Sequence, residues 1–226
     1  MRKGCILMHI SSLPSSYGIG KLGKSAYSFI DFLCRSGIKA WQILPLSPTS
    51  YGDSPYQSFS VNAGNPYFID FETLQEEKLL NREDYAQIIW EDNPRQVNYS
   101  IIYDNCFDVL KKAFARFIPN QSDEYSDFLK KNKDWLDEYA FFMALKFKYD
   151  GKPWYEWDKK LAMRDENALS KARKELEKDI DFFKFLQFKF YQQWFRVKNY
   201  ANECGIEIIG DIPIYTAYDS VEAWAY

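Results

Sequence analysis

The residues best suited to binding chemistry lie in one long loop, within Trp41–Pro66. After the apolar run Ala40–Leu46, about twenty residues are rich in Ser, Pro, Gly, Tyr and Asn and carry almost no formal charge. Loops of this length in compact domains are usually functional or disordered. Disorder is disfavoured by the aromatic residues Tyr51, Tyr56 and Phe59. Uncharged hydroxyl, amide and aromatic groups suit a neutral, hydroxyl-rich ligand, and a packed loop without a ligand is the alternative.

A carboxylate, Asp211, is the second candidate. It follows Ile208, Ile209 and Gly210 within the predicted strand Ile206–Ile214. A carboxylate beside an apolar strand is costly to bury alone, so it needs a ligand hydroxyl or a protein cation, or it caps a helix. In parallel α/β folds, ligands bind beyond the carboxyl ends of strands. The loops after the first two predicted strands and Asp211 after the third all occupy such positions.

Other residues carry less chemistry. His9 could act as a base, but it lies within the first predicted strand and no Ser or Cys nucleophile motif stands beside it. The glycines Gly18, Gly20 and Gly23 form GIGKLG, which does not match the dinucleotide-binding pattern, and the sequence has no Walker A motif. His9 is the only histidine, and the four cysteines form no CxxC pair. We therefore expect no metal and no cofactor.

Composition limits the partners. The 226 residues are 46% hydrophobic and 27% charged, which is typical of a globular protein. A net charge of -3 argues against nucleic acid or an anionic membrane as a partner. No stretch approaches the length of apolar sequence that a membrane-spanning helix needs. The dispersed cysteines are expected to be reduced, and the start MRKGCILMHI has no convincing cleavage site, so we expect a cytoplasmic protein.

The elements that must position these residues begin with a βαβ unit. The predicted elements are a strand at Lys3–Ile10, a helix at Lys24–Ser36 that ends at Gly37, and a strand at Ala40–Leu46. The two strands should be parallel, with a right-handed crossover. A brief extended segment is expected at Tyr67–Phe71.

The following sequence is helical in character. One stripe ends before Pro119 and consists of Ile102, Cys106, Val109, Ala113 and Phe117. A second begins with Trp135, Tyr139, Phe142 and Lys146 and is followed by a break at Gly151–Trp154. The last is capped by Gly205 and consists of Phe183, Leu186, Phe190, Trp194, Val197 and Ala201. A third buried strand at Ile206–Ile214 and a helix starting in Asp219–Trp224 complete the chain.

Four stretches resemble the 4-alpha-glucanotransferases known as amylomaltases or disproportionating enzymes, a branch of the alpha-amylase clan. They are GCILMHISSLPSSYGIGKLG from Gly4, WQILPLSPT from Trp41, SPYQSFSVNAGNPYFID from Ser54 and GDIPIYTAYDSVEAWA from Gly210. Supporting matches include DEYAFFMALK from Asp137 and PWYEWDKKLAMRD from Pro153. The matches run through the chain in order. The combination of SPYQSFS, AGNP and GDIPIY is highly specific, and Thr216 is a small departure from the family pattern.

The resemblance implies an α/β fold, the N-terminal part of a TIM (β/α)8 barrel with about three parallel strands and a large helical insertion. We expect residues 1–71 to form barrel strands 1 and 2 with the substrate loop, 72–180 the insertion, and 181–226 a barrel helix with strand 3. The implied partners are maltooligosaccharides, or α-1,4-glucans. By the same resemblance, Tyr56 lines the donor subsites and Asp211 supports substrate and nucleophile. Ser54, Gln57 and Asn65 match the substrate-binding motif without individual roles.

The implied mechanism is retaining: a carboxylate attacks the anomeric carbon, and a second sugar later accepts the glycosyl unit. In the family the three catalytic carboxylates lie on strands 4, 5 and 7, which would follow Tyr226. We therefore expect no catalytic residue in this chain and no activity from it alone. Two alternatives stay open, a non-catalytic glucan-binding module and an alpha-amylase-type hydrolase, although SPYQS and AGNP do not support the hydrolase.

Overall fold

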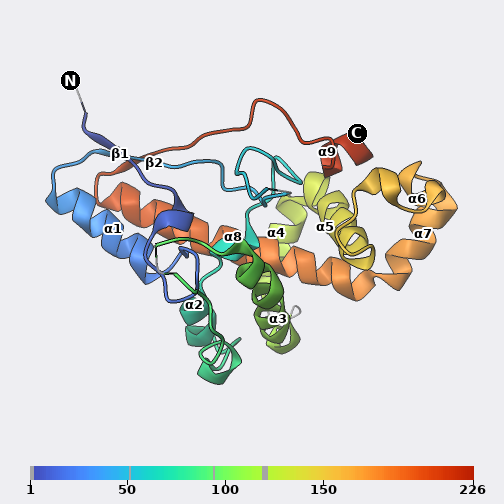
Figure 1. Cartoon of the computed structure of the whole chain (residues 1–226), viewed down its shortest axis with the longest axis horizontal. Coiled ribbons are helices and arrows are strands. Elements are labelled where there is room, and N and C mark those ends of the chain that lie inside the picture. The colour runs from blue at the N-terminus through green and yellow to red at the C-terminus, as the bar shows by residue number, and fades with distance from the viewer. Residues whose placement is uncertain (1–2, 51, 94, 119–121) are drawn as a thin grey trace. The chain divides into compact units, whose positions relative to one another are not determined.

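A computed structural model describes residues 3–50, 52–93, 95–118 and 122–226 (Figure 1). Within these ranges, helices predominate and the strands are short. In chain order the elements are β1 (Cys5–Leu7), η1 (Ile10–Ser12), α1 (Lys24–Arg35), β2 (Ala40–Gln42), η2 (Pro66–Phe68), α2 (Phe71–Glu76), η3 (Arg82–Asp84), α3 (Tyr99–Arg116), α4 (Asp123–Lys131), α5 (Lys133–Lys148), η5 (Trp154–Glu156), α6 (Lys159–Ala162), α7 (Glu166–Glu175), α8 (Glu177–Glu203), β3 (Glu207–Ile209) and α9 (Val221–Ala225).

Two compact units interleave along the chain. Unit 1 consists of Met1–Leu46, Asn65–Phe117 and Lys189–Ile212. Unit 2 consists of Ser47–Gly64, Ile118–Phe188 and Pro213–Tyr226. Helix α8 therefore contributes its first part to unit 2 and its second part to unit 1. The expected division into residues 1–71, 72–180 and 181–226 stays a prediction.

The three strands of unit 1 form one parallel sheet in the order β1-β2-β3. Cys5 pairs with Ala40, and Ala40 pairs with Glu207. The predicted parallel arrangement is confirmed, but each strand is shorter than expected. The third predicted strand is confirmed, but its predicted bounds Ile206–Ile214 and its predicted burial are wrong, because β3 covers only Glu207–Ile209 and two of these three residues are exposed. Within the described residues β3 pairs with β2 alone, and the chain after it leaves the sheet, so Ile212 is 80% exposed.

Helix α1 confirms the first predicted helix. Its buried positions Ala26, Ile30 and Leu33 recur at helical spacing, as an amphipathic helix requires. The helix ends where Gly37 adopts a φ of 70°, and the Ile38 N–H then donates to the Leu33 carbonyl at 3.1 Å.

The expectation of an extended segment at Tyr67–Phe71 is wrong. Pro66–Phe68 forms the 3-10 helix η2, and α2 begins at Phe71. Both turns have side-chain caps. The Asn65 side chain accepts from the Tyr67 N–H, and Asp70 Oδ1 accepts from the Thr73 N–H at 2.7 Å. These local hydrogen bonds outweigh the β propensity of the apolar residues.

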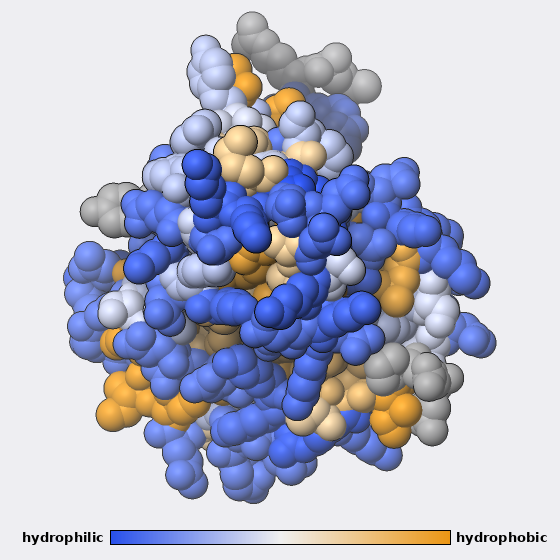
Figure 2. Space-filling model, turned by 90° about the vertical axis from the view of Figure 1, so that its right-hand side faces the viewer, coloured by the Kyte–Doolittle hydropathy of each residue, from blue (hydrophilic) through white to orange (hydrophobic). Residues whose placement is uncertain are grey.

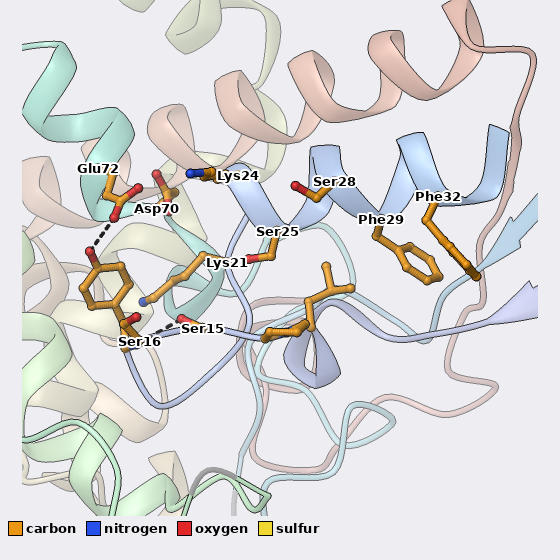
Figure 3. Close-up of a pocket in the computed structure, with 13 residues that line it drawn as sticks. Ser15, Ser16, Lys21, Lys24, Ser25, Ser28, Phe29, Phe32, Asp70 and Glu72 are labelled. Atoms are coloured by element: carbon orange, nitrogen blue, oxygen red, sulfur yellow. Dashed lines mark hydrogen bonds between the residues drawn. The ribbon is translucent and has the colours of Figure 1, made fainter. Parts of the chain in front are cut away.

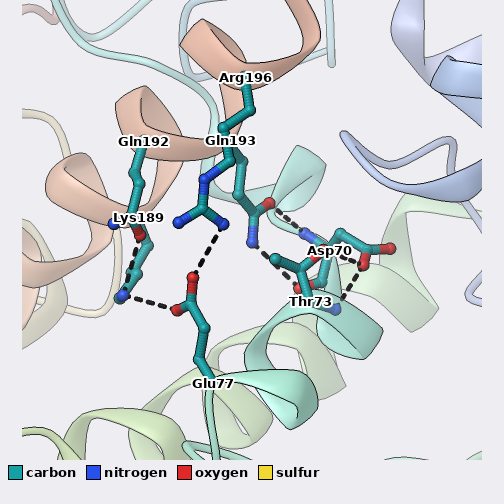
Figure 4. Close-up of polar contacts among 7 residues, drawn as sticks. All are labelled: Asp70, Thr73, Glu77, Lys189, Gln192, Gln193 and Arg196. Atoms are coloured by element: carbon teal, nitrogen blue, oxygen red, sulfur yellow. Dashed lines mark hydrogen bonds and ion pairs between the residues drawn. The ribbon is translucent and has the colours of Figure 1, made fainter.

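Polar contacts join α2 to the unit-1 part of α8 (Figure 4). Glu77 accepts from Lys189 Nζ at 2.7 Å and from Arg196 at 3.1 Å. Gln193 accepts from the Asp70 N–H at 2.7 Å and donates to the Asp70 carbonyl at 3.2 Å. The start of α2 is thereby fixed on α8.

Helix α3 buries Ile102, Cys106, Val109 and Ala113 of its predicted stripe, whereas Phe117 is half-buried and Pro119 lies outside the described residues.

The core of unit 2 is formed mainly by aromatic side chains on α5, α8 and α9. Trp224 of α9 lies 5.9 Å from Phe141 and 5.8 Å from Phe142, measured between ring centroids. Lys146, the charged member of the predicted stripe on α5, is also buried. Where α6 and α7 face the viewer in Figure 2, hydrophilic side chains cover most of the surface. Within the described residues, no helix combines the length and the apolar character needed to cross a membrane.

Candidate functional site

The carboxyl ends of the three strands form one candidate binding region, which lies within unit 1. The ladder extends slightly past the strands, because Met8 N–H donates to the Gln42 carbonyl and Ile43 N–H donates to the Ile209 carbonyl. His9 and Asp211 each lie two residues beyond the last residue of their strand. Both residues therefore follow the carboxyl ends of their strands, whose last residues Leu7 and Ile209 both pair with Gln42.

Asp211 is half-buried at this edge. Its Oδ1 accepts a hydrogen bond from the Ile212 N–H at 2.8 Å, which holds the carboxylate against its own backbone turn. Asp211 lies two residues past the end of β3, outside the strand that the sequence predicted to contain it. Whether its partner is a ligand hydroxyl stays a prediction.

His9 is a buried residue that the sequence interpretation set aside. Its ring packs edge-on against Phe68, with 5.4 Å between ring centroids. Burial lowers the pKa of His9 from its ordinary 6.5 to about 4, so the imidazole is neutral at pH 7. The buried Nδ1 has no hydrogen-bond partner among the described residues. A neutral ring with one uncommitted nitrogen can exchange a hydrogen bond with a hydroxyl group. The sequence feature that could have pointed to His9 was its position near the end of the first predicted strand.

The long loop forms another candidate binding region, which lies within unit 2 and is described by itself. An antiparallel bridge joins Thr49 to Ser58, and the Ser50 N–H donates to the Gln57 carbonyl at 3.0 Å. Between these residues the chain turns at Ser54, whose Oγ accepts from the Tyr56 N–H at 3.3 Å.

This turn brings three of the predicted residues together, since Ser54, Tyr56 and Gln57 occupy one short hairpin. The Tyr56 side chain is 46% exposed. That the loop is ordered rather than disordered stays a prediction, and Tyr51 lies outside the described residues.

The base of the loop is tied to α9 by a carboxylate. Glu222 Oε1 accepts from Ser60 Oγ at 3.0 Å and from the Val61 N–H at 2.9 Å. The Val221 N–H donates to the Phe59 carbonyl at 2.9 Å. Contacts with α9 therefore hold the base of the hairpin in place. Sequence reasoning did not identify Glu222 as the residue that makes them.

Asn65 belongs to unit 1 and is buried. Its Oδ1 accepts from the Tyr67 N–H at 3.0 Å, and its own N–H donates to the Leu46 carbonyl at 2.7 Å. These bonds give Asn65 a structural task as the cap of η2. A role in substrate binding stays a prediction.

The structure also contains a pocket of about 670 Å³ beside α1, with all its lining residues in unit 1 (Figure 3). None of the five predicted site residues lines it. Its buried cation, Lys21, donates to the Tyr67 carbonyl at 2.8 Å and lies 3.9 Å from the centre of the Phe71 ring. Glu72 accepts from the Tyr17 hydroxyl at 2.8 Å. Lys21 and Glu72 therefore both have partners within the protein.

Close packing explains the spaced glycines near this pocket. A Cβ added at Gly18, where φ is 72°, would lie 2.2 Å from the Trp90 carbonyl oxygen. One added at Gly20 would lie 1.8 Å from the Ile10 carbonyl oxygen. The backbone approach, rather than a phosphate, requires glycine here. Among the described residues, no group of three or more His, Cys, Asp or Glu side chains is placed to hold a metal ion.

Comparison with known proteins places these features in a family context. The family model described as 4-alpha-glucanotransferase matches residues 8–226. A 4-alpha-glucanotransferase of Clostridium butyricum is 49% identical over 96% of this chain and 45% of its own length. One of Streptococcus pneumoniae is 44% identical over 99% of this chain and 45% of its own length.

A solved structure gives the same relation. Amylomaltase from Streptococcus agalactiae, in complex with acarbose, superposes with a TM-score of 0.94 at 44% identity. The match covers 99% of this chain and 46% of that chain. The expected fold, three parallel strands of a TIM barrel with a large helical insertion, is thereby confirmed. The chain spans about half the length of the relatives that it matches.

Proposed function

Because the chain belongs to the 4-alpha-glucanotransferase family, we propose that the protein containing it transfers α-1,4-glucan segments between maltooligosaccharides. The observation that carries this proposal is the family match over residues 8–226, which includes the SPYQSFS, AGNP and GDIPIY motifs. The acarbose in the Streptococcus agalactiae amylomaltase supports an oligosaccharide-like ligand. A cytoplasmic location stays a prediction from the sequence.

The proposed chemistry is a retaining double displacement. A carboxylate attacks the anomeric carbon while an acid protonates the departing glycosidic oxygen, and a covalent glycosyl-enzyme forms. A hydroxyl of the acceptor sugar then attacks the same carbon and gives up its proton to the former acid, which releases the enzyme carboxylate. We infer that these catalytic carboxylates lie in the part of the relatives' sequences that extends beyond the match to this chain. We also infer that residues 1–226 alone carry no transfer activity.

The described residues would serve substrate binding. The exposed ring of Tyr56 can stack on a sugar, and the Ser54 turn fixes the backbone beneath it. Asp211 at the strand end can accept hydrogen bonds from sugar hydroxyls, and Gln57 beside Tyr56 can exchange them. Asn65 would act mainly by shaping the chain between the loop and α2.

The test uses the full-length protein and maltotriose. We expect release of glucose together with longer maltooligosaccharides, measured by chromatography of the products. Tyr56→Ala and Asp211→Ala should each lower kcat/KM at least tenfold, which corresponds to about 1.4 kcal/mol. Hydrolysis without chain lengthening would favour the amylase-type alternative, and glucan binding without any product would favour a binding module. Unchanged kcat/KM in both variants would contradict the assigned roles.

A further inference from the structure

Three aromatic rings gather on the surface of unit 2, outside the hairpin that carries Tyr56. Trp154 and Tyr155 lie in η5, and Tyr218 lies just before α9. The Tyr155 and Tyr218 rings are stacked at 5.3 Å with 28° between their planes, and the Trp154 centroid lies 5.3 Å from that of Tyr218. We call these three residues the aromatic platform. Tyr155 is 51% exposed and Tyr218 is 68% exposed, so much of both rings faces water.

Hydrogen bonds to an ion pair between the buried Lys146 and the half-buried Asp219 hold the platform in place. Trp154 Nε1 donates to the Tyr218 carbonyl at 2.8 Å, and the Trp154 N–H donates to Asp219 Oδ1 at 3.2 Å. Asp219 Oδ2 accepts from the buried Lys146 Nζ at 2.6 Å. The same Nζ donates to the Lys152 carbonyl at 3.2 Å. Both segments that carry the rings are therefore fixed on α5, and little conformational entropy is left to lose when a ligand binds.

This arrangement is unusual for rings that only fill space. Single exposed aromatic residues need no explanation, but a fixed group of them marks an interaction surface. The Tyr155 and Tyr218 hydroxyls donate to and accept from no described residue, so both are available to a ligand. The platform thus offers flat apolar faces bordered by uncommitted hydroxyl groups.

We propose that the aromatic platform binds α-1,4-glucan chains at a place separate from the Tyr56 hairpin. A glucose ring has an apolar face of C–H groups and a rim of hydroxyls, which matches this surface. The charges beneath the platform compensate each other, since Lys146 is paired with Asp219. Single-stranded nucleic acid also stacks on aromatic rings, but it needs a positively charged groove, and the net charge of this chain is -3. The choice of an α-glucan rests on the proposed function.

The platform and the long loop share one anchor. Lys146 Nζ lies 4.6 Å from the centre of the Phe59 ring, and Phe59 belongs to the loop that carries Tyr56. Both surfaces are therefore mounted on α5 within the same unit. The platform would add contacts for long glucan chains, beyond those that a short maltooligosaccharide makes at the hairpin.

The test is affinity electrophoresis of the full-length protein in native gels that contain glycogen. The double variant Tyr155→Ala/Tyr218→Ala should raise the apparent Kd for glycogen at least about fivefold. The double variant Tyr155→Phe/Tyr218→Phe should bind more tightly than the alanine variant because the rings remain. The matched control is Tyr103→Ala, on α3 of unit 1, where the side chain is 57% exposed, and it should bind as the wild type does.

The outcomes separate this inference from the proposed function. If maltotriose is converted but glycogen binding is unchanged in the double alanine variant, the platform assignment is overturned and the transferase function stands. If no transfer is seen but glycogen binding still depends on the platform, the transferase function is overturned and the platform assignment stands. An absence of glycogen binding by the wild type, or displacement of glycogen by a proline-rich peptide, also overturns the assignment. If Tyr155→Ala/Tyr218→Ala has no thermal transition and is therefore unfolded, the glycogen binding of the single variant Tyr218→Ala tests the assignment instead.

Discussion

At the scale of single residues, burial of His9 makes stability depend on pH. The pKa of His9 falls from its ordinary 6.5 to about 4 because the ring is desolvated. Between these values the unfolded chain binds a proton that the folded chain does not, so stability decreases as pH falls from 6.5 to 4 and this loss is complete below pH 4. The contribution lost between pH 8 and pH 5 is about 2 kcal/mol.

The variant His9→Gln isolates this contribution in the full-length protein. We expect urea unfolding midpoints measured at pH 8 and pH 5 to move further apart for the wild type than for the variant. Carboxylates that titrate in the same range are common to both proteins and cancel in the comparison. An equal pH dependence would show that His9 is not kept neutral by burial.

Residue identity in the core was easier to predict than residue partners. The apolar stripe Trp135, Tyr139, Phe142 and Lys146 correctly placed a lysine on a face that the structure buries. Its partner Asp219 lies 73 residues further along the chain, and no local pattern connects them. The same holds for Glu222, which binds the loop through Ser60 and Val61. Spacing predicts which residues share a helix face, whereas tertiary contacts decide which charges meet.

At the scale of elements, two glutamines of α8 fix the segment that follows the long loop. Gln187 accepts from the Gly64 N–H at 2.8 Å and donates to its carbonyl at 2.9 Å, within unit 2. Gln193 bonds both backbone groups of Asp70 in the same way, within unit 1. Both glutamines are buried, so each satisfies one N–H and one carbonyl that water does not reach.

Replacing either glutamine by leucine should be strongly destabilising. Gln187→Leu or Gln193→Leu leaves two buried backbone groups without partners, at a cost of about 2 kcal/mol or more. The control Asn199→Leu makes a similar change of amide to leucine on an exposed position of α8. Urea unfolding of the full-length proteins should show lower midpoints for both glutamine variants and little change for the control. A midpoint equal to that of the control would mean that water or neighbouring groups replace the lost bonds.

Element prediction succeeded where one signal dominated. The stripe from Phe183 to Ala201 and the cap at Gly205 correctly located most of α8. It failed for Tyr67–Phe71, where the caps Asn65 and Asp70 turn an apolar segment into helical turns. It also overestimated all three strands, because apolar runs continue past the last ladder hydrogen bond into the loops that carry the candidate site.

At the scale of the whole molecule, the sheet has open edges in the part of the chain that the structure describes. Strands β1 and β3 each pair only with β2, which leaves their outer backbone groups without ladder bonds. Apolar side chains stand beside these edges, and Leu7 of β1 and Ile209 of β3 are exposed. Unpaired edges with apolar neighbours promote association between chains. The matched relatives are about twice as long as this chain, and we infer that the remainder of such a protein covers these edges.

The isolated 226-residue chain should therefore associate through its open edges. We expect it to bind ANS, to lack a cooperative thermal transition, and to lose monomer in sedimentation experiments as its concentration rises. A lysine next to the β3 edge should reduce this association because charge opposes edge pairing. Ile209→Lys tests the edge because Ile209 belongs to β3 and is 44% exposed, and Ile89→Lys is the control at another exposed isoleucine. Ile209→Lys should raise the soluble monomer severalfold and the control should not, because Ile89 belongs to none of the three strands. A monomeric wild-type chain with a sharp thermal transition would show that the three-stranded sheet is stable with its edges open.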